Sequence, residues 1–108
     1  MTRPPLDLMQ GTVDVLILRT LAWQPMHGYG ISRFVRERSG EAITIENAAL
    51  YQALHRLERK RWVTSEWRLT ETNRRAKFYA LTAEGRKQLR AEQAEWRAYV
   101  AAVSKVLA

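Results

Sequence analysis

The feature that most restricts how this chain can fold is a long helical segment at its C-terminal end. After Gly85 the sequence holds neither proline nor glycine up to Ala108, so one helix of about 25 residues, about 37 Å long, is expected there. A chain of 108 residues builds only one modest core. That core cannot cover a helix of this length, so part of the helix needs another partner.

Apolar residues on this segment have the spacing of a helix that packs against another helix. Steps of 4, 3, 4, 3 and 4 residues connect a seam with one polar member: Leu89, Gln93, Trp96, Val100, Val103 and Leu107. The first helical segment also carries surplus apolar surface, which includes Leu16. A symmetric homodimer would cover both surfaces at once. The alternative is a tail that folds back on its own domain.

Composition narrows the classes of partner and of chemistry. Lys and Arg number 18 against 11 acidic residues, and the net charge of +7 favours polyanionic partners such as nucleic acid. Without cysteine, and with only two histidines, neither a metal nor a cofactor is expected. No nucleophile–base pair or carboxylate cluster indicates an enzyme. A signal-peptide pattern and an apolar run of about 20 residues are both lacking, so a soluble cytoplasmic protein without membrane contact is expected.

The first half of the chain predicts short helices and one short strand. Helices are expected over residues 6–23 and 31–40, with a break at Pro25, Gly28 and Gly30. Residues 42–45 alternate like a strand. A third helix then follows, with Asn47 as its N-cap and with one core face at helical spacing: Leu50, Leu54 and Leu57.

The next two segments predict a hairpin with a basic tip. Val63, Trp67 and Leu69 alternate with polar residues as in a half-buried strand, and Tyr79 and Leu81 share one face of the returning strand. Asn73 tolerates the backbone angles of a turn. Three cations lie at or beside the tip: Arg74, Arg75 and Lys77. Thr82 is expected to cap the final helix, with Glu84 in its first turn.

The order of these elements, helix, helix, strand, helix, strand, strand, helix, is that of a winged helix-turn-helix. Three blocks, "GTVDVLILRTLAWQPMHGYGI", "ALYQALHRLERKRWV" and "RRAKFYALTAEGRKQL", resemble the signature blocks of the PadR family of bacterial transcriptional regulators. The resemblance extends over nearly the whole chain from Gly11 on, and the single tail helix is similar to the family's smaller subgroup. The chain departs from the family pattern at residues 48–52, "AALYQ" in place of Gly-Thr-Leu-Tyr-Pro, and at Arg61, where a glycine is common.

The polar face of the third helix is the first candidate DNA-binding surface. Opposite its leucines lie Asn47, Tyr51 and His55, flanked by Ala48 and Gln52. Amide groups suit adenine and a methyl group suits thymine, so Asn47, Gln52 and Ala48 have the chemistry to read base edges in a major groove. Capping alone would explain Asn47 equally well. The family resemblance implies phosphate contacts for Tyr51 and Tyr29, and His27 is expected to be structural.

The hairpin tip is the second candidate surface. Arg74, Arg75 and Lys77 are expected to meet a phosphate backbone or to enter a minor groove, where guanidinium groups are favoured. Between His55 and Lys77 there are eight Lys and Arg against three Glu. This concentration of charge favours nucleic acid over a merely solvated surface.

The tail helix carries a candidate effector site. Trp96 on the seam is most simply a packing residue. In PadR-like regulators that this chain resembles, such a tryptophan stacks on a flat aromatic ligand between the subunits. The resemblance therefore implies a small planar aromatic ligand in contact with Gln93, Trp96 and Val100.

The sequence thus predicts a mainly α (α+β) protein with two parts. Residues 1–82 form a winged helix-turn-helix DNA-binding domain, and residues 83–108 form a C-terminal dimerisation helix, with Leu16 adding to the dimer contact. The expected function is that of a homodimeric repressor on a pseudo-palindromic operator in double-stranded DNA. A winged-helix protein–protein interaction module without specific DNA binding is the alternative. RNA is a weaker third partner, because the chain lacks the aromatic platform of single-strand binders.

Overall fold

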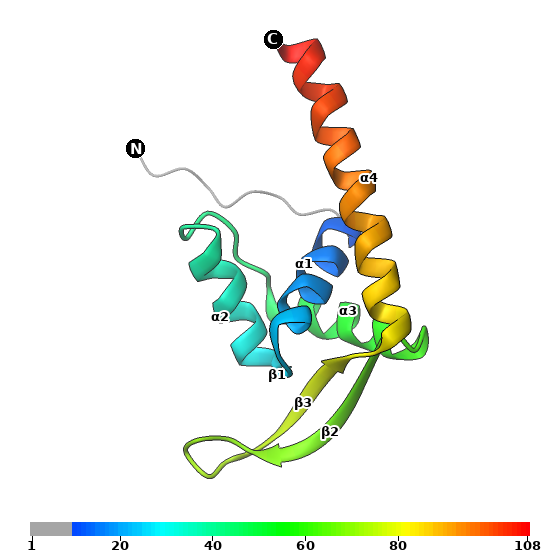
Figure 1. Ribbon diagram of the computed structural model, residues 1–108. Helices are drawn as coiled ribbons and strands as arrows, with labels where there is room; N and C mark the ends of the chain where they lie inside the picture. The colour runs from blue at the N-terminus through cyan, green and yellow to red at the C-terminus, as the bar shows by residue number, and fades with distance from the viewer. Residues whose placement is uncertain (1–9) are drawn as a thin grey trace.

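The computed structural model describes residues 10–108, which fold into four helices and a small sheet (Figure 1). The order is α1 (Gln10–Trp23), β1 (Met26–His27), α2 (Gly28–Arg38), α3 (Asn47–Arg59), β2 (Val63–Leu69), β3 (Arg75–Leu81) and α4 (Ala83–Leu107). The winged helix-turn-helix architecture predicted from the sequence is confirmed. The expected start of the first helix at residue 6 lies outside the described residues.

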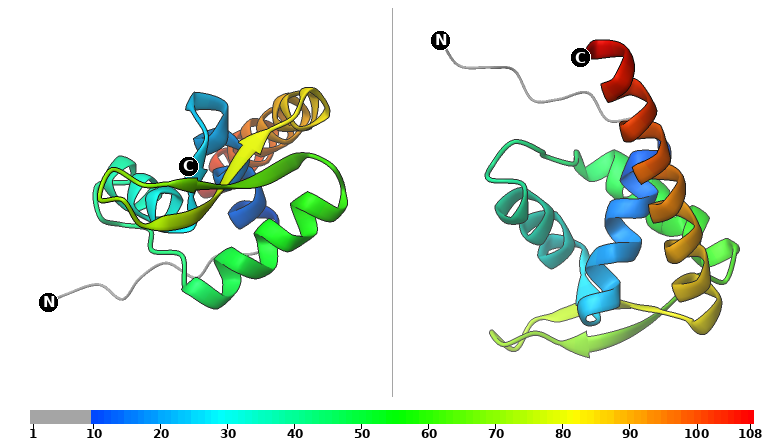
Figure 2. Two further views of the ribbon diagram at one scale, coloured as in Figure 1. Left: turned by 90° about the horizontal axis from the view of Figure 1, so that it is seen from below. Right: turned by 45° about the horizontal axis from the view of Figure 1, so that its top comes forward.

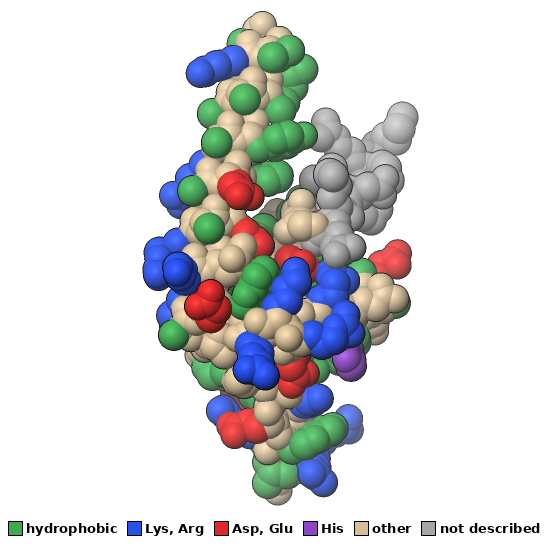
Figure 3. All heavy atoms as spheres, turned by 90° about the vertical axis from the view of Figure 1, so that its right-hand side faces the viewer, with side chains coloured by type: hydrophobic (Ala, Val, Ile, Leu, Met, Phe, Trp, Pro, Cys, Tyr) green, Lys and Arg blue, Asp and Glu red, His purple; other side chains and the backbone are tan. Residues whose placement is uncertain are grey.

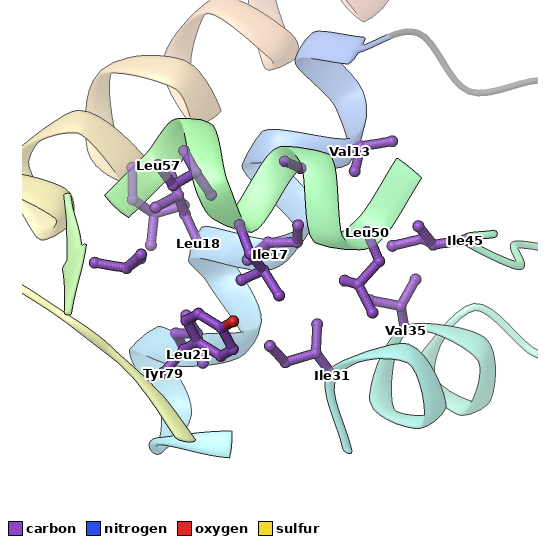
Figure 4. Packing of buried hydrophobic residues seen from close by; sticks show 14 residues of the cluster. Val13, Ile17, Leu18, Leu21, Ile31, Val35, Ile45, Leu50, Leu57 and Tyr79 are labelled. Atoms are coloured by element: carbon purple, nitrogen blue, oxygen red, sulfur yellow. The ribbon is translucent and has the colours of Figure 1, made fainter. Parts of the chain in front are cut away.

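The core lies between the first three helices and the base of the sheet (Figure 4). Ile17, Leu18 and Leu21 place α1 at its centre, each at most 1% exposed. The leucine face of α3 closes one side, with Leu50, Leu54 and Leu57 equally buried, as its helical spacing predicted. This core fixes the orientation of α3, so the opposite face of that helix points to solvent.

The sheet has three antiparallel strands in the order β1-β3-β2. In the hairpin, Val63 pairs with Leu81 and Leu69 pairs with Arg75. On the other edge of β3, Met26 pairs with Tyr79. The hairpin runs along the base of the molecule, and its far end extends away from the helices (Figures 1 and 2).

Two local expectations are wrong. Residues 42–45 form no strand, although Ile45 is buried and Ile43 half-buried as their alternation indicated. The first strand is instead Met26–His27. The expected helix break at Gly28 and Gly30 is also misplaced, because both glycines lie in the first turn of α2.

The final helix begins and ends as expected. Thr82 is its N-cap and accepts a hydrogen bond from the Gly85 amide, and Glu84 lies in the first turn. Thr82 is also the single residue between β3 and α4. Leu89, expected on the dimer seam, is only 6% exposed and belongs to the subunit's own core. Beyond it, α4 extends past the other elements (Figures 1 and 2).

At Arg61 the departure from the family pattern has a structural meaning. Arg61 has a φ of +64°, in the left-handed region that costs an L-residue energy and glycine none. The position lies in the turn between α3 and β2. A glycine here would adopt the turn without strain.

Candidate nucleic-acid interface

The solvent face of α3 presents the polar residues that the sequence placed there. Its members are all exposed: Asn47, Ala48, Tyr51, Gln52 and His55. Together with Arg56 and Arg59, four of them line a shallow surface hollow: Ala48, Tyr51, Gln52 and His55. Asn47 is the first helical residue and not the N-cap, which is Glu46. The capping role expected for Asn47 is therefore wrong, and its side chain faces solvent.

Two polar contacts hold α3 against its neighbours. Arg56 Nη2 donates to Asp14 Oδ1 of α1 at 2.7 Å, and the Asp14 side chain is 9% exposed. Such a buried pair costs desolvation but makes the loss of either partner expensive. At the other end, Ser65 Oγ of β2 donates to Glu58. Helix α3 is thus tied both to α1 and to the hairpin.

The junction of α2 and α3 is closely packed. A Cβ built on Gly28 would lie 2.5 Å from the Tyr51 hydroxyl, so the Tyr51 ring occupies the space that glycine leaves. His27 caps α2, as its Nδ1 accepts from the Gly30 amide at 3.0 Å. The structural role predicted for His27 is confirmed. Tyr29, two residues after His27, is 67% exposed at the start of α2.

The hairpin tip is an ordered turn. The Thr70 amide donates to the Arg74 carbonyl at 2.7 Å, the Asn73 amide donates to the Thr70 carbonyl at 2.9 Å, and Asn73 has the positive φ that the turn requires. Arg74 lies in this turn, Arg75 begins β3, and Lys77 follows on the same strand. None of the ion pairs among residues 10–108 involves these three cations. Their charge is therefore available to an external anion.

Comparison with known proteins identifies this arrangement. The model of the transcriptional regulator PadR-like family matches residues 17–91, from the middle of α1 into α4. The chain belongs to the PadR family. A transcriptional regulator from Clostridium thermocellum is 32% identical, with 93% of this chain and 97% of that chain covered and a TM-score of 0.82.

Two further relatives are similar to this chain. A PadR family transcription regulator from Clostridium difficile is 31% identical, with 89% of this chain and 98% of that chain covered and a TM-score of 0.77. An uncharacterized protein from Lysinibacillus sphaericus is 29% identical over 90 residues, which cover 83% of each chain. The protein is thus a PadR family transcriptional regulator, and DNA is the partner that the family indicates.

The PadR tail helix exposes a broad apolar surface beyond Leu89. Trp96 and Tyr99 are 48% and 61% exposed, and their rings stack with centroids 6.0 Å apart. The other exposed apolar side chains continue toward the C-terminus: Val100, Val103, Val106 and Leu107. Figure 3 shows apolar side chains along the upper part of α4, with Lys and Arg side chains crowded on the body below. Leu16 of α1 is half-buried against the core, and Gln93 is half-buried on α4.

Sequence reasoning missed two exposed residues of the β2–β3 hairpin, residues 63–81, which is called the wing below. Trp67 and Leu69 were expected to be half-buried, but they are 58% and 65% exposed, since the hairpin diverges from the helices toward its far end (Figure 1). The alternation with Val63 correctly placed all three on one face. No pattern in the sequence indicates how far Trp67 and Leu69 lie from the core.

No helix in the described part of the chain is long and apolar enough to cross a membrane. Within the same residues, no three metal-ligating side chains come together.

Proposed function

We propose that this PadR family regulator is a homodimeric repressor that binds a pseudo-palindromic operator in duplex DNA. The observation that carries the proposal is the juxtaposition of an exposed polar face on α3 with a wing whose cations have no carboxylate partner among residues 10–108. A helix with amide and hydroxyl groups fits a major groove, and cations beside it fit the flanking phosphates. In the proposal, Gln52, Asn47 and Ala48 face base edges.

In the proposal, residues around the exposed face of α3 contact DNA phosphates. Tyr51 and Tyr29 present hydroxyl groups on either side of the junction between α2 and α3, and His55 lies one turn further along α3. The wing residues Arg74 and Arg75 would meet the backbone next to the groove. These contacts position the helix without reading sequence.

The exposed apolar surface of α4 supports the homodimer. Trp96, Val100 and Val103 lie on one face of a helix that its own domain leaves uncovered. A second copy presents the same surface, and a symmetric contact covers both at once. In the proposal, Leu107 continues the contact and Leu16 borders it, whereas Leu89 does not take part, because it is buried within the subunit. Two linked recognition helices would then enter successive major grooves.

Salt dependence tests the wing. In the double variant Arg74→Ala/Arg75→Ala, log affinity should depend less steeply on log salt, by about 0.9 for each phosphate contact removed. Gln52→Ala should instead relax the base preference at one position of each half-site, by about 1–3 kcal/mol of discrimination, and keep the slope. The probe is the duplex that the wild-type protein selects from a random-sequence library.

A matched double variant controls for net charge. Arg97→Ala/Lys105→Ala removes two exposed cations from α4, far from the wing, and should leave the slope near the wild-type value. Equal slopes in all three proteins would contradict wing contacts. If the wild-type protein selects no duplex and does not shift DNA from upstream of its own gene, the chain acts as a protein–protein module and the proposed function fails.

We further propose a planar aromatic effector between the subunits at Trp96. The exposed Trp96 and Tyr99 rings form an aromatic surface, and Gln93 and Val100 flank it one turn away on either side. Binding of such a molecule would favour one arrangement of the two subunits and so change the distance between their two α3 helices.

A ligand panel tests this effector site. At least one planar aromatic compound should quench tryptophan fluorescence and raise the melting temperature, because a ligand specific for the folded dimer stabilises it. Trp96→Leu should lose both responses, whereas Trp23→Leu, which changes an exposed tryptophan on α1, should keep them. Unchanged fluorescence and melting temperature across the panel would contradict the effector site.

A further inference from the structure

Exposed apolar surface on the wing has no role in the contacts described so far. Trp67 and Leu69 lie on the face of the hairpin that, at its base, carries the buried Val63 and Tyr79. Only 1% of Val63 and 4% of Tyr79 is exposed, against 58% and 65% of Trp67 and Leu69. One face of the hairpin therefore changes from core at its base to a solvent-exposed apolar surface at its far end.

Cations border this apolar surface. Across the hairpin, Trp67 pairs with Lys77 and Leu69 pairs with Arg75. The guanidinium carbon of Arg75 lies 5.0 Å from the centre of the Trp67 ring, a cation–π contact that holds the charge beside the indole. Lys77 Nζ lies 6.0 Å from the Tyr79 ring centre in the same way. Arg75 and Lys77 are thus positioned by aromatic rings rather than by carboxylates.

The two faces of the wing differ in charge. On the opposite face, Arg68 forms an ion pair with Glu66, so its charge is neutralised locally. The face with Trp67 carries Arg75 and Lys77, neither of which joins an ion pair among residues 10–108. An external anion will therefore prefer the Trp67 face.

This face of the hairpin leads toward the exposed polar face of α3. Burial raises the pKa of Tyr79, and the nearby Glu58 and Tyr51 of α3 raise it further. Ser65, which pairs with Tyr79 across the hairpin, donates from its Oγ to Glu58 of α3, so the base of this face is joined to the helix that exposes Tyr51. A ligand seated on α3 that follows the hairpin outward reaches Lys77 and Trp67 together, and then Leu69 and Arg75.

We propose that Trp67 and Leu69 pack on the deoxyribose edges of the DNA backbone beside the recognition helix, with Arg75 on the adjacent phosphate. Apolar sugar edges flanked by phosphates match an apolar surface flanked by cations. An acidic protein would pair with the cations but offers no such regular alternation. The inference rests on the proposed function and adds a direct apolar contact to the cationic wing.

A double-mutant cycle on the duplex selected by the wild-type protein tests the apolar contact. Trp67→Ala should weaken binding about tenfold for each wing engaged. Arg75→Gln should lower the salt slope by about 0.9 per wing. The Trp67→Ala loss should persist in the Arg75→Gln background, because the indole itself contacts DNA. If the double variant binds like Arg75→Gln alone, Trp67 only orients Arg75 and the apolar contact is refuted.

Matched variants separate this contact from general effects. Trp23 is 62% exposed on α1 and Trp23→Ala should bind like wild type, and Arg68→Gln should retain the wild-type salt slope. The melting temperature of Trp67→Ala should equal that of wild type, since the side chain is exposed. Unchanged duplex affinity in Trp67→Ala would overturn this inference and leave the proposed function intact. Failure of the wild-type protein to bind any duplex would overturn both, and tighter binding of either single strand than of the duplex would assign Trp67 to base stacking instead.

Discussion

Gly85→Ala is expected to destabilise the protein by about 3 kcal/mol or more, the upper range for overpacking a closed site. A Cβ at this position would lie 2.1 Å from the Trp62 carbonyl oxygen and 2.7 Å from Leu81 Cδ1. The carbonyl is backbone and cannot swing away, because it already accepts from the amide and the hydroxyl of Thr82, each at 3.0 Å. The free energy of unfolding of such domains is about 5–15 kcal/mol, so this substitution would remove a large fraction of it.

Urea denaturation of Gly85→Ala at a fixed protein concentration measures the effect. Gly11→Ala is the matched control, since Gly11 also lies in a helix but has nothing within 4 Å of an added Cβ. That substitution should leave the free energy of unfolding unchanged or raise it by up to about 1 kcal/mol. Equal midpoints for the two variants would show that the turn between β3 and α4 yields more easily than its contacts indicate.

Val100→Glu is expected to separate the proposed dimer and to lower operator affinity by a factor of about 10² to 10⁴, the range over which linking two sites raises avidity. Val100 is 41% exposed on the apolar face of α4, one turn beyond Trp96. A carboxylate there would face its counterpart across a symmetric contact without a solvating partner. Sedimentation velocity gives the assembly state, and anisotropy with the selected duplex gives the affinity.

Ala98→Glu adds the same charge two residues earlier, about 200° around the helix. It is exposed on the opposite face and should remain dimeric with wild-type affinity. Circular dichroism should show both variants folded, because neither side chain belongs to the buried core. A dimeric Val100→Glu would contradict a contact through this face of α4.

The elements with strong local patterns were predictable, and the elements formed by distant pairing were not. The period of α4 and the hairpin with Asn73 at its turn follow from neighbouring residues alone. The strand Met26–His27 has only two residues and forms by pairing with β3. Two residues are too few to show a periodic pattern, so the sequence does not predict this strand. Residues 42–45 show the converse, since their alternation reports which side chains are buried and not whether a second strand lies alongside.

The candidate site shows the same division. The exposed face of α3 was predictable because the leucine spacing fixes the opposite side of the helix. The N-cap is Glu46 and not Asn47, so the helix begins one residue earlier than predicted. Sequence patterns do not resolve a helix boundary to one residue. Trp67 and Leu69 were placed on the correct face, but how far the hairpin extends beyond the core depends on the packing of α1 and α2.

Because Thr82 is the single residue between β3 and α4, the wing and the tail helix are rigidly connected. The hydroxyl oxygen of Thr82 accepts a hydrogen bond from the Gly85 amide, and its single proton is shared between the Arg61 and Trp62 carbonyls, at 2.8 and 3.0 Å. These hydrogen bonds hold together the start of α4, the end of β3 and the turn that follows α3. No flexible linker separates these elements, so a rotation of α4 is passed on to the hairpin. In the proposed dimer, a change in the angle between the two tail helices would therefore rotate both hairpins, and the displacement would be largest at the hairpin tips.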